Sequence, residues 1–207
     1  MTKGRLLWLA LFAAILVPFA LWGDTFEAYG TELLAHAQPS PTLALTLVAL
    51  LAGDLVLPIP SSLLAVGTGA VFGTLFGAVL IAVGFSVGAW IGYEVGRSAG
   101  RAGVKRWVED EQRERMEAFA AKHGAGLLVA MRAVPVLAEA SVVVAGSSGM
   151  PRGRVLLTTT VANIVIAVVY SAAGSMAADT GSLELAAMAG VGIPGVAMVL
   201  ASRFTRR

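Results

Sequence analysis

The stretch GLLVAMRAVPVLAEASVVVAG, residues 126–146, decides how this chain folds. It is apolar over almost its whole length, yet it contains Arg132, Pro135 and Glu139. Arg132 is the only one of the fifteen Lys and Arg residues that lies inside a long apolar stretch. A cation at membrane depth is energetically expensive and marks a functional site by default, and a proline interrupts a helix. The stretch therefore predicts a broken membrane helix with a polar site at the break.

The composition of the whole chain is that of a membrane protein. Of its 207 residues, 57% are hydrophobic and only 14% are charged, whereas soluble domains carry about 25% charged residues. In lipid, only helices and closed barrels satisfy every backbone hydrogen bond, and the alternating pattern of barrel strands is absent. We therefore expect an all-α integral membrane protein, built as a polytopic bundle. The net charge of +2 and the lack of a basic face argue against nucleic acid as a partner.

Charged residues predict the topology, because cytoplasmic loops of membrane proteins are enriched in Lys and Arg. Apart from Arg132, these residues fall in four groups: Lys3 and Arg5, residues 97–122, Arg152 and Arg154, and residues 203–207. We expect these groups and both termini to lie in the cytoplasm. Residues 24–41 and 177–184 contain acids but no Lys or Arg, so we expect them outside.

The first half of the chain then requires a broken segment. Residues 42–97 begin outside and end inside, but they are too long for one crossing, and Pro58 and Pro60 interrupt them. The simplest solution is a re-entrant hairpin, which enters and leaves the bilayer on the same side, over residues 42–69. A full span over residues 70–96 would follow it.

The second half repeats this arrangement in the opposite orientation. Residues 124–149 begin and end inside, so we expect a second re-entrant hairpin, broken at Pro135, before spans over residues 155–176 and 185–202. Inverted repeats whose broken helices meet at the midplane are a transporter architecture. An offset of 77 residues supports the repeat: it pairs Pro58 with Pro135, Gly69 with Gly146 and Tyr93 with Tyr170, and it sets Asp54 opposite Met131. We predict hairpin breaks at Pro58, Pro60, Pro135, Gly69 and Gly146.

The chain is predicted to have three regions: an N-terminal transmembrane helix and outer loop (1–41), a core (42–177), and a C-terminal transmembrane helix with a basic tail (178–207). Residues 6–22 could instead be the apolar part of a signal peptide, but Trp22 stands where cleavage needs a small residue, so we expect a retained helix. Within the core, residues 104–123 predict an amphipathic helix. It would lie on the cytoplasmic membrane surface or pack on the domain as an ordinary solvated helix.

Three ionisable residues border the proline breaks, so opposed hairpin tips would bring Asp54, Arg132 and Glu139 together. A guanidinium holds phosphate or carboxylate in a fork and stays charged, so Arg132 is predicted to hold an anion. Asp54 and Glu139 are predicted to take up and release protons, because burial favours the neutral carboxyl group. The alternative is structural: Arg132 pairs with one of the acids and fixes the two hairpins together.

Ser62 and Asn163 are further candidates for this site. Membrane hydroxyl groups mostly serve helix packing, and Ser62 is the serine we most expect to depart from that rule. Asn163 either bonds across helices or lines the cavity. The chain has no Cys, His36 and His123 have no metal-ligand company, and no catalytic motif or phosphate loop is present. We therefore expect no metal, no cofactor and no enzymatic activity.

The hairpin sequences resemble the DedA family of the SNARE-associated Golgi protein (VTT-domain) superfamily. The resemblance rests on DLVLPIPSS (54–62), GAVFG (69–73), GYEVGR (92–97) with Gly100, and RAVP (132–135) followed by Ala145, Gly146, Met150 and Asn163. It covers about residues 51–174. The order and spacing of these motifs, rather than any one of them, make the match specific.

The resemblance implies a bacterial inner-membrane protein with two opposed re-entrant hairpins that acts as a proton-dependent transporter or lipid translocase. The family's essential residues are acids in the first hairpin and two Arg in the second; Asp54 matches the first acid and Arg132 the first Arg. Ser62 stands where many members have a second acid, and Ala138 where many have the second Arg. One cation fewer weakens the case for a doubly charged phosphate, and Glu139 is a candidate for the acid that Ser62 lacks.

The leading hypothesis is an integral membrane transporter or lipid translocase that moves an anionic lipid or small anion with proton coupling. Its partners would be membrane lipids and protons, and a homo-oligomer is compatible with the sequence. The rival is a non-transporting scaffold that organises lipids or partner proteins through the amphipathic helix. A membrane-embedded lipid enzyme ranks last, because no nucleophile–base pair or metal cluster is visible.

Overall fold

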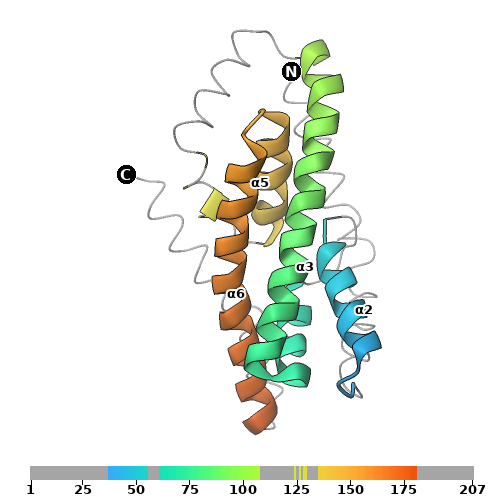
Figure 1. Ribbon diagram of the computed structural model, residues 1–207, viewed down its shortest axis with the longest axis vertical. Coiled ribbons are helices and arrows are strands. Elements are labelled where there is room, and N and C mark those ends of the chain that lie inside the picture. Colours follow the sequence, from blue (N-terminus) through green and yellow to red (C-terminus); the bar gives the residue numbers. More distant parts are fainter. Residues whose placement is uncertain are drawn as a thin grey trace.

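The computed structural model describes residues 37–55, 61–107, 124, 126, 128–129 and 135–180. These residues are mostly helical, and no strand occurs among them, which confirms the all-α prediction. The helices are α2 (Pro41–Ala52), α3 (Ser61–Trp107), α5 (Pro135–Ser147) and α6 (Arg152–Thr180) (Figure 1). We call α2 with α3 the first half, and α5 with α6 the second half.

Several predicted features lie outside the described residues: the N-terminal helix (6–22), the C-terminal span (185–202), Pro58, Pro60 and Arg132. The predicted amphipathic helix (104–123) lies partly inside them. Helix α3 continues to Trp107, so the first residues of that prediction belong to the long helix of the first half, and residues 108–123 lie outside.

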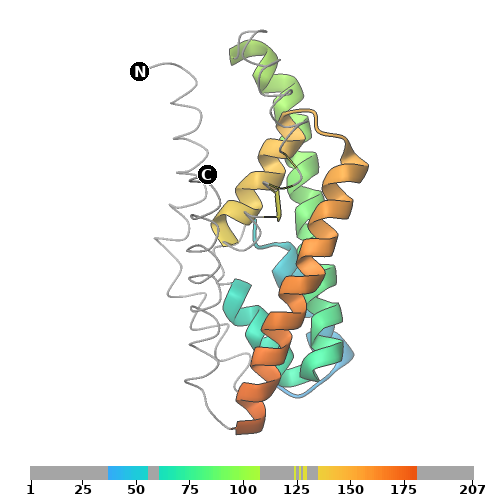
Figure 2. The ribbon, with the colours of Figure 1, turned by 90° about the vertical axis from the view of Figure 1, so that its left-hand side faces the viewer.

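Helix α2 begins at a cap that its sequence encodes. Ser40 Oγ accepts a hydrogen bond from the backbone N–H of Leu43 at 3.2 Å, and Pro41 takes the first helical position, where its missing N–H is not needed. The helix ends at Gly53. It reaches only part of the way along α3, and the first part of α3 runs back toward the end where α2 began (Figures 1 and 2).

Helix α3 consists of two helices that meet at Gly73. This residue has φ 74° and ψ 173°, a backbone conformation that is open to glycine and strained for other residues. The turn separates a short helix, residues 61–72, from a long one, residues 74–107. The predicted boundary between hairpin and span, at residues 69–70, is therefore corrected to Gly73.

The second half contains an equivalent turn. Helix α5 starts at Pro135, a helix position that suits proline, and the chain turns at Gly149, which has φ 74°. The N–H of Met150 donates to the carbonyl of Ala145 at 3.2 Å, and the N–H of Gly149 donates to that of Gly146 at 3.4 Å. This is the bond pattern of a Schellman C-cap, which favours glycine at the turning position. The long helix α6 follows directly.

Gly69 and Gly146, predicted as hairpin breaks, both lie inside helices, so that part of the prediction is wrong. A Cβ on Gly69 would overlap the backbone of Ser171, and a Cβ on Gly146 would overlap the backbone of Tyr93. Both glycines therefore permit close helix approach, which is the usual role of small residues in membrane bundles.

The two halves hold each other through reciprocal contacts. Gly174 of α6 lies against the backbone carbonyl of Val66 in the first half, and Gly96 of α3 lies against that of Val143 in the second. Val66 and Val143 are separated by the 77-residue offset found in the sequence. The short helix of each half thus packs on the long helix of the other half.

A hydrogen bond joins two residues at the same offset. Asn163 Nδ2 of α6 donates to Ser86 Oγ of α3 at 3.3 Å, across a sequence separation of 77. A residue that contacts its own repeat equivalent lies close to the axis that relates the repeats. The Ser86–Asn163 pair therefore marks this axis, and α3 and α6 pass it in opposite directions (Figure 1).

Among the described residues, two helical stretches are long and apolar enough to cross a membrane, by length and composition: Ser61–Ala99, which includes the turn at Gly73 and has a mean hydropathy of 2.2, and Arg152–Thr180, with a mean hydropathy of 2.0. Their outward faces carry exposed large apolar side chains, among them Leu75, Val79, Val83, Leu157, Val161 and Val165. Their facing sides bury small residues, among them Ala78, Ala89, Ala162 and Ala167. Soluble monomers rarely expose such continuous apolar faces, so this distribution suits contact with lipid.

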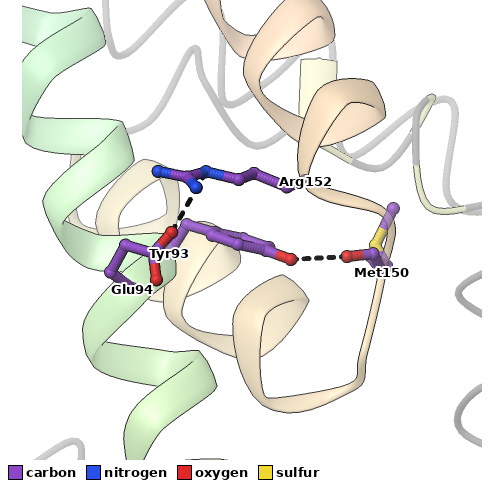
Figure 3. A network of polar contacts seen from close by, with 4 residues as sticks. All are labelled: Tyr93, Glu94, Met150 and Arg152. Carbon is purple, nitrogen blue, oxygen red and sulfur yellow. Dashed lines mark hydrogen bonds and ion pairs between the residues drawn. The ribbon is translucent and has the colours of Figure 1, made fainter.

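A hydrogen bond ties the two halves together near one end of the bundle (Figure 3). Tyr93 of α3 is 2% exposed, and its hydroxyl donates to the carbonyl of Met150, in the turn before α6, at 2.7 Å. Beside it, Arg152 Nε lies 3.1 Å from Glu94 Oε1, and the Arg152 guanidinium lies 5.6 Å from the ring centroid of Trp90. The ion pair is partly solvent-exposed and contributes little, so the buried hydrogen bond is the main tie.

The opposite end has a matching tie. The Ser171 hydroxyl of α6 lies within donating distance of two carbonyl oxygens in the first-half turn, Gly73 at 3.1 Å and Thr74 at 2.8 Å. Each glycine turn is therefore held by a hydroxyl group from the long helix of the other half.

Replacement of Gly73 by Ala is expected to destabilise the protein by about 1–3 kcal/mol through backbone strain. A Cβ at Gly73 would meet no atom within 4 Å, so the effect isolates the backbone conformation. Gly153→Ala is the matched control, because its Cβ would also meet open space and Gly153 has no positive φ. Thermal unfolding of the purified protein measures both. Equal unfolding temperatures for the two variants would contradict the assigned turn.

Replacement of Tyr93 by Phe removes the buried hydrogen bond to Met150 and is expected to destabilise the protein by about 0.5–1.5 kcal/mol. Tyr170→Phe is the control: Tyr170 is the repeat equivalent of Tyr93, is also buried, and makes no such bond among the described residues. Tyr93→Phe should therefore have a lower unfolding temperature than Tyr170→Phe. The reverse order would contradict the assigned role of the Tyr93–Met150 hydrogen bond.

Candidate functional site

A cavity of about 30 Å³ lies between the two halves. We call it the central cavity and define it by its described lining residues: Asp54, Ser61, Ser62, Phe85, Ala138, Glu139, Asn163, Ile166 and Tyr170. The polar lining residues come from both halves. Asp54, Ser61 and Ser62 belong to the first half, and Glu139, Asn163 and Tyr170 belong to the second. Asp54 and Glu139, two of the three ionisable residues expected to converge, both line the cavity.

The polar residues reach the cavity because helices end there. Asp54 follows the C-terminal cap of α2 at Gly53, and Ser61 and Ser62 are the first residues of α3. Glu139 stands in the second turn of α5, which starts at Pro135. The backbone groups at such ends have no partner within their own helix, so they favour polar company. Two helix N-termini, those of α3 and α5, therefore face a common polar space, and their dipoles favour negative charge there.

The cavity is symmetric in position but not in chemistry. Ser62 and Glu139 are separated by the 77-residue offset, as are Ser61 and Ala138, so each pair occupies equivalent places in the two halves. The first half contributes hydroxyl groups at these places, and the second contributes a methyl group and a carboxyl group. The first half supplies its own carboxyl group from Asp54, which has Met131 at the offset position.

Asn163 is the most buried polar residue of the cavity, with a relative exposure of 1%. It lies in the middle part of α6, roughly 16 Å along the helix from Arg152 at the usual rise per residue. Its Nδ2 group bonds Ser86, whereas its Oδ1 atom is buried and has no hydrogen-bond partner among the described residues. The amide thus donates on one side, and its acceptor on the other side is unused among the described residues.

Four predicted site residues come together at this cavity: Asp54, Ser62, Glu139 and Asn163. Arg132 lies outside the described residues, so its predicted role stays a prediction. Two other serines of the second half bond within their own helix: Ser141 donates to the carbonyl of Ala138, and Ser147 donates to that of Val144, both in α5.

Sequence reasoning missed several lining residues. Ser61, Phe85 and Tyr170 line the cavity but are not among the predicted site residues, and neither is Ser86, which bonds Asn163. The offset contained one usable signal, because it pairs Ser86 with Asn163 and so places two polar residues on the repeat axis. Aromatic residues in an apolar helix carry no such signal.

Metal binding finds no support in the described part of the chain, which holds no group of three or more His, Cys, Asp or Glu residues that could ligate an ion. The cavity offers carboxyl, hydroxyl and amide groups instead. This set can exchange protons and form hydrogen bonds with a polar ligand.

The fold and the cavity define a class: helical proteins with helices long and apolar enough to cross a membrane, in which helix ends line a buried polar cavity. The family model of the VTT domain matches residues 59–176, more than half of the chain. The chain therefore belongs to the VTT-domain family, that of DedA and SNARE-associated Golgi proteins. This confirms the resemblance found at about residues 51–174. Comparisons with curated proteins and with solved structures gave no match.

Proposed function

We propose that this protein is an integral membrane transporter or lipid translocase, which moves an anionic lipid or small anion with proton coupling. One observation carries the proposal: a polar cavity with carboxyl groups from both halves lies between helices whose outer faces are apolar. Buried ionisable groups in membrane segments are rare and typically mark ion or substrate pathways.

The proposed orientation follows from the charges. The Arg152 end of α6 would lie at the cytoplasmic face of a bacterial inner membrane, with both termini on that side. The position of Trp90 beside Arg152 supports placing this end of α6 at the membrane surface, because tryptophan and arginine side chains favour the membrane–water interface. The fold-back of α2 against the first part of α3 supports a re-entrant hairpin entering from the outer face, and α5 would belong to its counterpart from the inner face.

An anionic substrate is supported by the two helix N-termini at the cavity. Their N–H groups and dipoles stabilise negative charge, and broken helices in transporters bind anionic groups in this way. Arg132 would complete this site, because RAVP (132–135) leads directly into α5, whose N-terminus faces the cavity. A single arginine suits a singly charged headgroup or small anion better than a doubly charged phosphate.

Proton coupling is supported by the placement of Asp54 and Glu139 on one cavity. A nearby negative charge disfavours the charged form of a carboxyl group, and this effect is stronger where water is excluded than in bulk solvent. An anion entering the cavity would therefore favour the protonated carboxyl groups, which links substrate binding to proton uptake.

Asp54→Asn and Glu139→Gln are each expected to reduce proton-driven transport roughly tenfold or more, the effect of losing an interaction with a charged group of about 1.5–3 kcal/mol. The protein is reconstituted into vesicles with a panel of anionic lipids, and transport is followed with and without an imposed pH gradient. Arg132→Ala is expected to reduce transport of every anionic substrate.

The matched controls are Asp179→Asn and Glu94→Gln, which alter an exposed acid at the end of α6 and a partly exposed acid at the bundle end. They are expected to retain transport. Wild-type protein that inserts correctly but moves no lipid or anion, under any gradient, would favour the scaffold instead. If Asp54→Asn and Glu139→Gln both left transport unchanged, the proposed proton coupling would be wrong.

A further inference from the structure

The hydrogen bonding of the Asn163 side chain is a feature that the proposed transport function does not explain. Its side chain is almost fully buried and lines the central cavity, and its Nδ2 group is engaged by Ser86. Its Oδ1 atom is buried without a hydrogen-bond partner among the described residues. Buried acceptors without partners are energetically expensive and rare in native proteins, so this atom points to a ligand.

We propose that Asn163 Oδ1 is the acceptor of a binding site for an O–H donor inside the central cavity. The O–H group would come from an ordered water molecule or from a hydroxyl of the transported molecule, such as a protonated phosphate or a headgroup alcohol. Both sources offer the same chemistry, a proton donated to a neutral acceptor that cannot itself be protonated at physiological pH.

The dimensions of the cavity suit water. Its volume of about 30 Å³ has room for roughly two water molecules, because each needs about 10–15 Å³ measured in this way. A buried water molecule also needs two to four polar partners. Besides Asn163, the cavity offers the hydroxyl groups of Ser61 and Ser62 and the carboxyl groups of Asp54 and Glu139.

This site would give Asn163 a defined role in proton coupling, and that role rests on the proposed function. A water molecule held by Oδ1 would bridge toward the carboxyl groups of Asp54 and Glu139, which belong to different halves. Asn163 would then be a positioning residue: it holds the donor, while the carboxyl groups exchange the proton.

Three variants separate this role from simple packing. Asn163→Leu keeps the branching and heavy-atom number of the side chain but removes the acceptor. Asn163→Ser keeps an acceptor and leaves space for a second water molecule. Ser86→Ala removes the bond between the halves but leaves Oδ1 in place. If Asn163 served only to bond Ser86, then Ser86→Ala would reproduce the defect of Asn163→Leu.

We expect Asn163→Leu to reduce proton-driven transport in vesicles about tenfold and to flatten its dependence on pH between roughly pH 5 and 8. Asn163→Ser and Ser86→Ala should each stay within about threefold of the wild type and keep its pH profile. Equal defects in Asn163→Leu and Ser86→Ala, with the pH profile unchanged, would overturn the proposal.

A second readout does not depend on transport. An experimental density map of the wild-type protein in lipid nanodiscs should show a donor within about 2.7–3.2 Å of Asn163 Oδ1. Nanodiscs of neutral lipid identify water, and nanodiscs with anionic lipid reveal a headgroup hydroxyl in its place. Density that shows only carbon atoms around Oδ1 would overturn the site, even if transport were found. Absence of transport with the donor present would overturn the proposed function and leave the site intact.

Discussion

The arrangement depends on one constraint: helices that end inside an apolar body must satisfy the backbone groups freed at their ends. Helix α2 ends at Gly53, and α3 begins at Ser61, part-way along the long helices. Helix α5 begins at Pro135 on the other side of the same cavity. In lipid, such ends are tolerated only around a protected or water-filled space. The polar cavity is therefore a consequence of the broken helices, and the function proposed for it makes use of polarity that the fold already requires.

Small residues make this geometry possible, because they let the backbones of the two halves come into contact. Gly96 meets Val143 and Gly174 meets Val66, each across the boundary between the halves. In a bilayer the hydrophobic effect does not drive helices together, so close packing must supply much of the association. The contacts run in reciprocal pairs, which fixes the halves about the axis at Ser86 and Asn163. Packing is therefore nearly symmetric, whereas the chemistry inside the cavity is not.

Much of this could be predicted from the sequence, because polarity inside apolar sequence is a strong signal. Pro135 was predicted as a break and stands at the start of α5, whereas Pro58 and Pro60 lie outside the described residues. Polarity beside the prolines selected Asp54 and Glu139, and polarity in the middle of an apolar span selected Asn163. Glycine gave a weaker signal. A glycine that permits close approach, such as Gly69, looks the same in a sequence as one that adopts a positive φ, such as Gly73. The distinction depends on which backbone lies opposite, and that is a tertiary property.

The two halves bring different chemistry to the cavity, and this difference matters for the proposed proton coupling. Asp54 and Glu139 reach the cavity from different halves and from places that are not repeat equivalents, since Ser62 is the equivalent of Glu139. A shift of one half against the other would therefore change the separation of the two carboxyl groups and their access to either side. The hydroxyl ties at Tyr93 and Ser171 hold the two turns at opposite ends of the bundle.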